Sequence, residues 1–222
     1  MNEEIYIVTS DASAELTEKR SRFISVLHSV HSEDEALNYI EQIRKQYHDA
    51  RHNCYAFLIG ENAELFRFSD DGEPSGTAGR PILEVLQNSR IRDCVIVVTR
   101  YFGGILLGAG PLARAYGQAA ALAVQAAKDS GLISPLYTGR KLSVRCSYSF
   151  LGKIQYLLAQ NDIHPMEIDY KEDILFTLAV EEEKVSFLTE IIKEATAASA
   201  VAEDLGGIQF LKQDQKIIPY GL

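Results

Sequence analysis

The chain has 222 residues, of which 46% are hydrophobic and 24% charged, and its formal net charge is −9. This composition is typical of a globular protein and excludes a disordered, collagen-like or disulfide-stabilised chain. No apolar run approaches the roughly 18 residues of a membrane helix, and the acidic N-terminus lacks the features of a secretory signal. We therefore expect a cytoplasmic protein with no membrane partner.

Charge and cysteine content narrow the function classes further. The three cysteines are Cys54, Cys94 and Cys146, whose spacing fits neither a disulfide framework nor a paired-cysteine metal site. The negative net charge opposes loose nucleic-acid binding, so any such contact must come from a local patch, and we expect no DNA sequence specificity. Ten of the twelve arginines precede residue 135. Because arginine binds anions in bidentate fashion, this asymmetry is the first indication of a site.

The first third of the chain predicts strands and one helix. Residues 4–8 and 22–30 are rich in β-branched and aromatic side chains, which predicts two opening strands joined as a long hairpin across the polar stretch 9–20. The Ser32–Glu35 segment is a capping box, and apolar residues then recur at helical spacing, which predicts a helix to about His48. Residues 54–68 predict a second hairpin.

A turn-rich loop over residues 69–79 leads to a short helix with Pro81 in its first turn. Residues 93–100 predict a buried central strand, followed by a glycine-rich turn over 102–110. An alanine-rich helix from about residue 111 to 128 follows, and Gly131 ends it.

The remainder of the chain predicts a second domain. Its strands and helices alternate in the order βαββαβ, which is the ferredoxin-like split βαβ unit. The boundary lies near residue 135, so we expect an α+β protein with domains at 1–135 and 136–222.

The densest polar cluster lies in residues 68–81, where three carboxylates precede a Ser-Gly-Thr-Ala-Gly turn that enters a helix. Backbone N–H groups of such a turn, at a helix N-terminus, can bind an anion. The candidate anion- or RNA-binding residues here are Ser75, Gly76, Thr77, Gly79 and Arg80. The alternative is a loop whose own side chains satisfy its backbone.

A second candidate site follows the predicted central strand. Arg100 could hold a phosphate or carboxylate, and Tyr101 could stack on a base beside the turn at Gly103 and Gly104. The structural alternative pairs Arg100 with Asp70 or Asp71. Arg51 and Arg114 complete the candidate set.

Other signatures are absent or incomplete. Residues 108–113 match a dinucleotide-binding fingerprint formally, but no acidic residue follows at the ribose position. His48 and His52 precede Cys54, yet a turn from helix into strand is a better interpretation than a metal site. We expect no cofactor and no metal.

Four blocks in order resemble the YigZ and IMPACT family, and the resemblance spans nearly the whole chain. The blocks are KRSRFI (19–24), HDARHNCYA (48–56), FSDDGEPSGTAGRP (68–81), and TRYFGG (99–104) with LGAG (107–110). The resemblance implies an N-terminal domain similar to domain IV of elongation factor G, with a ribosomal-protein-type βαβ fold, and a C-terminal domain similar to its domain V. It also implies a role in translation, because the eukaryotic relatives act in translational control. It implies no catalytic residue set.

Two main hypotheses follow. The first is a cytoplasmic, translation-associated binding protein that engages RNA, a ribosome or a translation factor through an arginine-lined cleft between the two candidate sites. The second is an enzyme for a small anionic substrate, with Asp70, Asp71 or Glu73 as acid or base and Arg100 as a clamp. A third alternative gives the same residues a purely structural role.

Overall fold

A computed structural model describes residues 4–221 of the chain. The chain divides into two compact units, the first ending at Ser134 and the second beginning at Pro135. Each unit is α+β and has its own hydrophobic core. None of the helices in the described part has the length and apolar composition needed to cross a bilayer.

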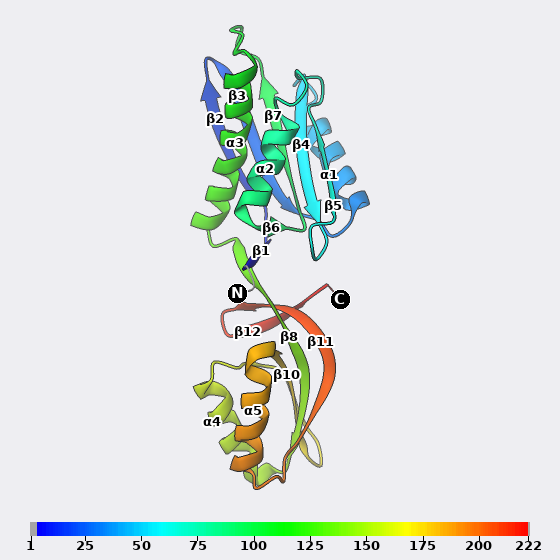
Figure 1. Ribbon diagram of the computed structural model, residues 1–222, viewed down its shortest axis with the longest axis vertical. Helices are drawn as coiled ribbons and strands as arrows, with labels where there is room; N and C mark the ends of the chain where they lie inside the picture. Colours follow the sequence, from blue (N-terminus) through cyan, green and yellow to red (C-terminus); the bar gives the residue numbers. More distant parts are fainter. Residues whose placement is uncertain (1–3, 222) are drawn as a thin grey trace. The chain divides into compact units, whose positions relative to one another are not determined.

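The N-terminal unit is built on a five-stranded antiparallel sheet in the order β2-β3-β7-β4-β5 (Figure 1). Its strands are β2 (Ala12–Glu18), β3 (Ser21–Ser29), β4 (His52–Ile59), β5 (Leu65–Ser69) and β7 (Cys94–Tyr101). Strand β7 is the middle strand, and all its residues but the last are buried. The prediction of a central strand here is confirmed.

The opening of the chain differs from the sequence prediction. Strand β1 (Ile5–Val8) does not form a hairpin with residues 22–30. It pairs in parallel with β6 (Ile91–Arg92). The hairpin partner of β3 is β2, which lies inside the stretch predicted to be a polar connection. Alternate residues of β2 face inward, and of the three that pack on the core (Ala12, Ala14 and Leu16) two are alanines, so the alternation carries little hydrophobic signal.

Helices cover both faces of this sheet. They are α1 (Glu33–Gln46), α2 (Gly79–Ser89) and α3 (Ala109–Asp129). Successive residues of β4 and β7 face opposite sides, as the pleat of a strand requires. One set packs with α1, and the other packs with α2 and α3 (Figure 1). The alanines of α3 let that helix approach the sheet closely, since Ala119 and Ala123 are fully buried.

The C-terminal unit has an antiparallel sheet in the order β9-β10-β8-β11-β12. Its elements are β8 (Ile133–Cys146), α4 (Leu151–Gln160), β9 (Pro165–Tyr170), β10 (Ile174–Glu181), α5 (Glu182–Ala195), β11 (Val201–Gln213) and β12 (Lys216–Tyr220). Apart from a short turn of 3₁₀ helix before α4, the first six elements have the predicted βαββαβ order. Their strand order is that of the ferredoxin-like unit. Strand β12 is an addition that the sequence analysis missed.

Candidate functional site

The four sequence blocks meet at one end of the N-terminal sheet. In the register of the strands, Arg22 lies opposite Tyr101, His52 opposite Arg100, and Tyr55 opposite Ser69. The turn before β3, the start of β4, the loop after β5 and the loop after β7 therefore lie together, at the top of this unit in Figure 1. We call this region, formed by residues 19–24, 48–56, 68–81 and 99–110, the motif-bearing end.

Asp70 satisfies the backbone of the loop that leads into α2. Its Oδ1 accepts the N–H groups of Ala78 and Gly79, both at 2.9 Å, and its Oδ2 accepts the N–H of Gly76 at 2.8 Å. Thr77 donates its hydroxyl to the carbonyl of Pro74. Three N–H groups of the turn that was predicted to bind an external anion are thus bound to a carboxylate of the protein itself, as in the self-capped loop of the alternative interpretation.

Asp71 holds the same loop against β4 and α1. Its Oδ2 accepts the N–H of Asn53 at 2.7 Å, and its Oδ1 pairs with Nη2 of Arg44 at 2.8 Å. The carbonyl of Asp71 lies 2.9 Å from Nδ1 of His52. His52 therefore has a structural partner in the loop, while His48 is exposed at the end of the preceding turn.

Glu73 and Arg100 form a buried ion pair. Nη1 of Arg100 lies 2.6 Å from Oε1 of Glu73, and the two side chains are only 7% and 5% exposed. Tyr116 of α3 donates its hydroxyl to the same oxygen at 2.8 Å, and burial raises the pKa of this phenol, which keeps it a donor. The structural alternative, in which Arg100 pairs with Asp70 or Asp71, named the wrong carboxylate. Those two carboxylates are occupied by the contacts described above, and Glu73 reaches the guanidinium instead.

Arg100 is enclosed by aromatic rings as well. Its guanidinium carbon lies 5.4 Å from the ring centre of Phe23 and 5.6 Å from that of Phe102. Nη2 donates to the hydroxyl of Ser21 at 3.3 Å, and Nε has no hydrogen-bond partner in the described part of the chain. The side chain therefore joins β3, β7 and the loop after β5.

The other predicted binding residues divide by exposure. The exposed ones are Arg51, Ser75, Gly76, Arg80, Gly104 and Arg114, whereas Thr77 and Gly79 are buried. Arg80 pairs with Glu84 one turn along α2, and the hydroxyl of Tyr101 donates to Asp49 at 2.7 Å. The exposed arginines, and not Arg100, are therefore the side chains that can reach a ligand from solution.

Gly103 fixes the loop after β7 to the turn before β3. A Cβ added to Gly103 would lie 2.1 Å from the carbonyl carbon and oxygen of Arg20. The N–H of Gly103 donates to the hydroxyl of Ser21. No side chain fits in this space without a backbone shift.

We expect Gly103→Ala to lower the free energy of unfolding by about 1–3 kcal/mol, because the two backbones must separate. Chemical denaturation measures the change. Gly110→Ala is the matched control, since its new methyl group would meet nothing closer than 3.8 Å. Equal stability of the two variants would show that the close approach at Gly103 is unimportant.

Two participants were missed by the sequence analysis. Ser21 and Tyr116 are both fully buried, and each bonds a member of the candidate set. Ser21 is the first residue of β3, and Tyr116 interrupts an alanine-rich helix face. For Tyr116 a signal was available, because it is a large polar side chain within a run of small buried residues, and a buried hydroxyl needs a hydrogen-bond partner.

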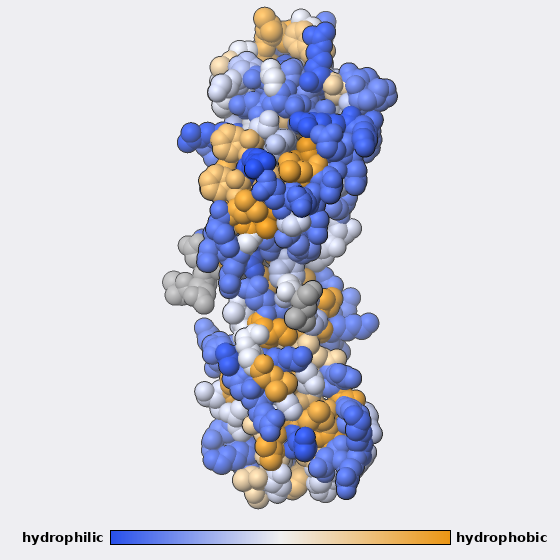
Figure 2. Space-filling view, turned by 90° about the vertical axis from the view of Figure 1, so that its right-hand side faces the viewer, coloured by the Kyte–Doolittle hydropathy of each residue, from blue (hydrophilic) through white to orange (hydrophobic). Residues whose placement is uncertain are grey.

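The loop after β7 also carries exposed apolar side chains. Phe102 is 48% exposed, Ile105 41% and Leu106 86%. Figure 2, which views the molecule from the right-hand side of Figure 1, shows hydrophobic surface at the end of the N-terminal unit where this loop lies. Hydrophobic surface also lies along the edge strand β5, where Phe66 and Phe68 are exposed.

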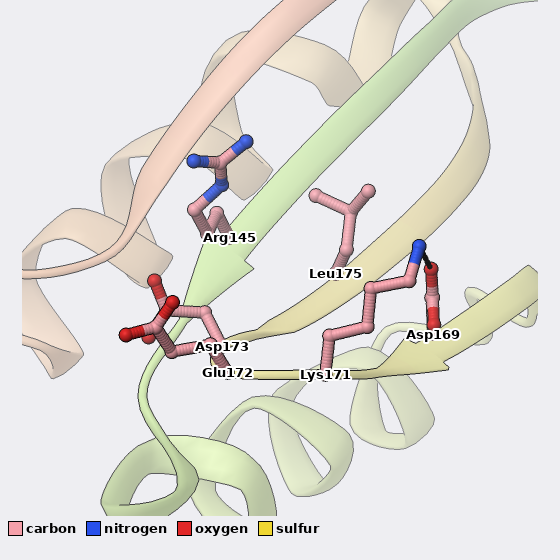
Figure 3. Close-up of a pocket in the computed structure, with 6 residues that line it drawn as sticks. All are labelled: Arg145, Asp169, Lys171, Glu172, Asp173 and Leu175. Carbon is pink, nitrogen blue, oxygen red and sulfur yellow. Dashed lines mark ion pairs between the residues drawn. The ribbon is translucent and has the colours of Figure 1, made fainter.

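A separate pocket lies in the C-terminal unit, with a volume of about 260 Å³ (Figure 3). It is lined by Arg145 of β8, Asp169 of β9, Leu175 of β10 and the turn residues Lys171, Glu172 and Asp173. Lys171 pairs with Asp169 at 2.6 Å. The lining mixes both signs of charge on an exposed surface and contains none of the predicted site residues, so it does not define a candidate site.

These observations define an α+β protein of two units, one with a motif-bearing end and one with a ferredoxin-like sheet. A family model described as the Impact N-terminal domain matches residues 19–124, and a domain of unknown function, DUF1949, matches residues 144–199. The chain is 41% identical over 191 residues to the IMPACT family member YvyE of Bacillus subtilis, covering 86% of each chain. It is 37% identical over 175 residues to the IMPACT family member YigZ of Escherichia coli, covering 76% of this chain and 81% of that relative.

A solved structure also matches over almost the full length. It is the crystal structure of a hypothetical protein, 31% identical, with a TM-score of 0.55, covering 93% of this chain and 99% of that one. The chain belongs to the IMPACT family.

Proposed function

We propose that this chain is a translation-associated binding protein whose N-terminal unit engages the translation machinery through its motif-bearing end. The observation that carries the proposal is the charge arrangement there. Lys19, Arg20, Arg51 and Arg114 are exposed, and none of them has an ion pair within residues 4–221. The sequence resemblance to a family with relatives in translational control supports the choice of partner.

Three carboxylates of the same end are already engaged by the protein itself. Asp70 faces backbone N–H groups, Asp71 faces Arg44, and Glu73 is buried against Arg100. Glu18 and Asp49 also lie at this end, and the latter accepts a hydrogen bond from Tyr101. A local cationic surface can therefore form on a chain whose net charge is −9. Binding through it would be specific and sensitive to salt.

The proposed binding site is an exposed cationic surface, in place of the arginine-lined cleft expected from the sequence. Arg100 cannot present its guanidinium to a ligand while Glu73 holds it. The enzyme alternative meets the same difficulty, because Asp70, Asp71 and Glu73 all have internal partners. We propose that this unit is similar to domain IV of elongation factor G, and that this similarity explains why such a surface would bind the ribosome.

Arg114→Glu is expected to remove the protein from ribosomal particles in a sucrose gradient of cell lysate at low salt. Arg114 lies in the second turn of α3 and is exposed, so the charge reversal leaves the core intact. The wild type is expected to move with the particles at low salt and to be released as salt is raised. The protein is detected by blotting across the gradient.

Lys128→Glu is the matched control. Lys128 is an exposed cation on the same helix, about 21 Å further along its axis. It should stay with the particles as the wild type does. If the wild type remains at the top of the gradient at every salt concentration, or if both variants behave alike, the proposed binding surface is wrong.

A further inference from the structure

Three apolar side chains project from a loop that is well fixed at its base. The 102–108 loop exposes Phe102, Ile105 and Leu106, and Leu106 at 86% exposure has almost no contact with its own protein. Gly104 and Gly108 adopt positive φ values of 83° and 81°, which shape the loop. Leu107 points inward and is buried. The loop is therefore anchored, and its apolar tip faces solvent.

The two segments next to the base of this loop carry exposed cations. The contact of Gly103 with the backbone of Arg20 places the loop against the turn that carries Lys19 and Arg20. Both turn residues have positive φ, at 44° and 68°, so the turn is tight. On the other side the loop runs directly into α3, where Arg114 lies one turn from the start and comes close to Gly110. The apolar tip thus belongs to the same end of the unit as three exposed cations, Lys19, Arg20 and Arg114.

We infer that the 102–108 loop is an apolar wedge that inserts between unstacked bases of RNA, while Lys19, Arg20 and Arg114 hold the adjacent phosphates. This inference rests on the proposed function and names the partner at the same surface. In complexes with DNA, apolar side chains such as leucine and phenylalanine insert between base steps, next to arginine and lysine in the groove. Phe102 adds a ring on which a base can stack.

The size of the tip favours RNA over a protein partner. Three partly exposed side chains offer a few hundred Å² at most, whereas a stable protein interface buries about 800 Å² on each partner. A wedge between bases needs only one or two apolar side chains, because most of the affinity comes from phosphate contacts. The flanking cations match the charge of an RNA backbone and provide those contacts.

Leu106→Ser is expected to weaken binding to purified ribosomal particles about 10-fold, toward the lower end of the range for losing one stacked base, because leucine has no ring to stack on. The side chain is exposed, so the fold should be unchanged, and circular dichroism checks this. Because no charge is lost, the dependence of log K on log salt should keep its wild-type slope. Arg114→Glu should instead reduce the magnitude of that slope.

A photoreactive benzoylphenylalanine at position 106 identifies what the tip contacts. The full chain is irradiated with ribosomal particles and with vesicles containing anionic lipid, and the cross-linked product is digested with RNase or protease. The inference expects a product that shrinks with RNase, and no such product from the same group at position 128. A product that shrinks only with protease, a lipid adduct, or no product at position 106 would overturn it.

Loss of the binding surface and loss of the wedge would give different results. If the wild type does not bind the particles at all, the proposed function fails and the wedge fails with it. If binding persists and depends on Arg114 but is unaffected by Leu106→Ser, the cationic surface stands and the wedge alone is wrong.

Discussion

Arg100→Leu is expected to lower the free energy of unfolding by about 3–5 kcal/mol. The substitution leaves the Glu73 carboxylate, whose side chain is only 5% exposed, without its cationic partner, and an uncompensated buried charge is among the most costly changes in a protein. Leucine keeps much of the apolar contact with Phe23, so the loss reports mainly on charge. Denaturant unfolding followed by fluorescence of the tyrosines or by circular dichroism measures it.

The double variant Arg100→Leu/Glu73→Gln separates charge from packing. Neutralising Glu73 removes the buried charge, and Tyr116 can still donate to the amide oxygen, so most of the lost stability should return. Arg80→Leu serves as the control for an arginine in an exposed pair, and should cost less than about 1 kcal/mol. A single Arg100→Leu variant as stable as the wild type would contradict the structural role of this ion pair.

Asp70→Ala is the second large effect, with an expected loss of about 3 kcal/mol. Three backbone N–H groups, at Gly76, Ala78 and Gly79, lose their acceptor, and two of these residues are buried where water cannot replace it readily. Each unsatisfied buried donor costs about 1–3 kcal/mol, and the exposed Gly76 regains a bond to water. Thermal and denaturant unfolding both measure the loss.

Asp70→Asn should be milder than Asp70→Ala. Its single amide oxygen can still accept the N–H groups of Ala78 and Gly79, while its amide nitrogen cannot accept that of Gly76. Local effects are read from hydrogen exchange at the first turn of α2, which should accelerate in both variants. If Asp70→Ala unfolds as the wild type does, the carboxylate does not cap this helix.

Much of the fold was predictable because its signals are local. Helix α1 (Glu33–Gln46) begins where the capping box placed it: Ser32 accepts the N–H of Glu35, and Glu35 reaches back to the N–H of His31. The buried strand β7 and the split βαβ order of the second unit follow from apolar runs of the right length. Strand β2 was missed because Ala12 and Ala14 face inward and give a weak pattern.

The candidate site was predictable in its segments but not in its pairing. The sequence shows that residues 68–81 and 99–104 are unusual, and the structure brings them together. Which carboxylate meets Arg100 depends on how the loop turns at Asp71, where φ is 43°, and at Gly72. That turn directs Glu73 inward, toward a tyrosine 43 residues further along the chain. Contacts of this separation have no local signal.

The edge strand β5 has a consequence for handling the protein. An outermost strand offers free backbone groups to any other strand. Here Phe66 and Phe68 also expose hydrophobic surface on one face of that edge. Two features limit intermolecular sheet growth: the strand has only five residues, and Arg67 between the two rings carries a charge held by Glu33 of α1. Self-association of concentrated protein would therefore begin at this edge in a variant in which Arg67 is replaced by an uncharged residue.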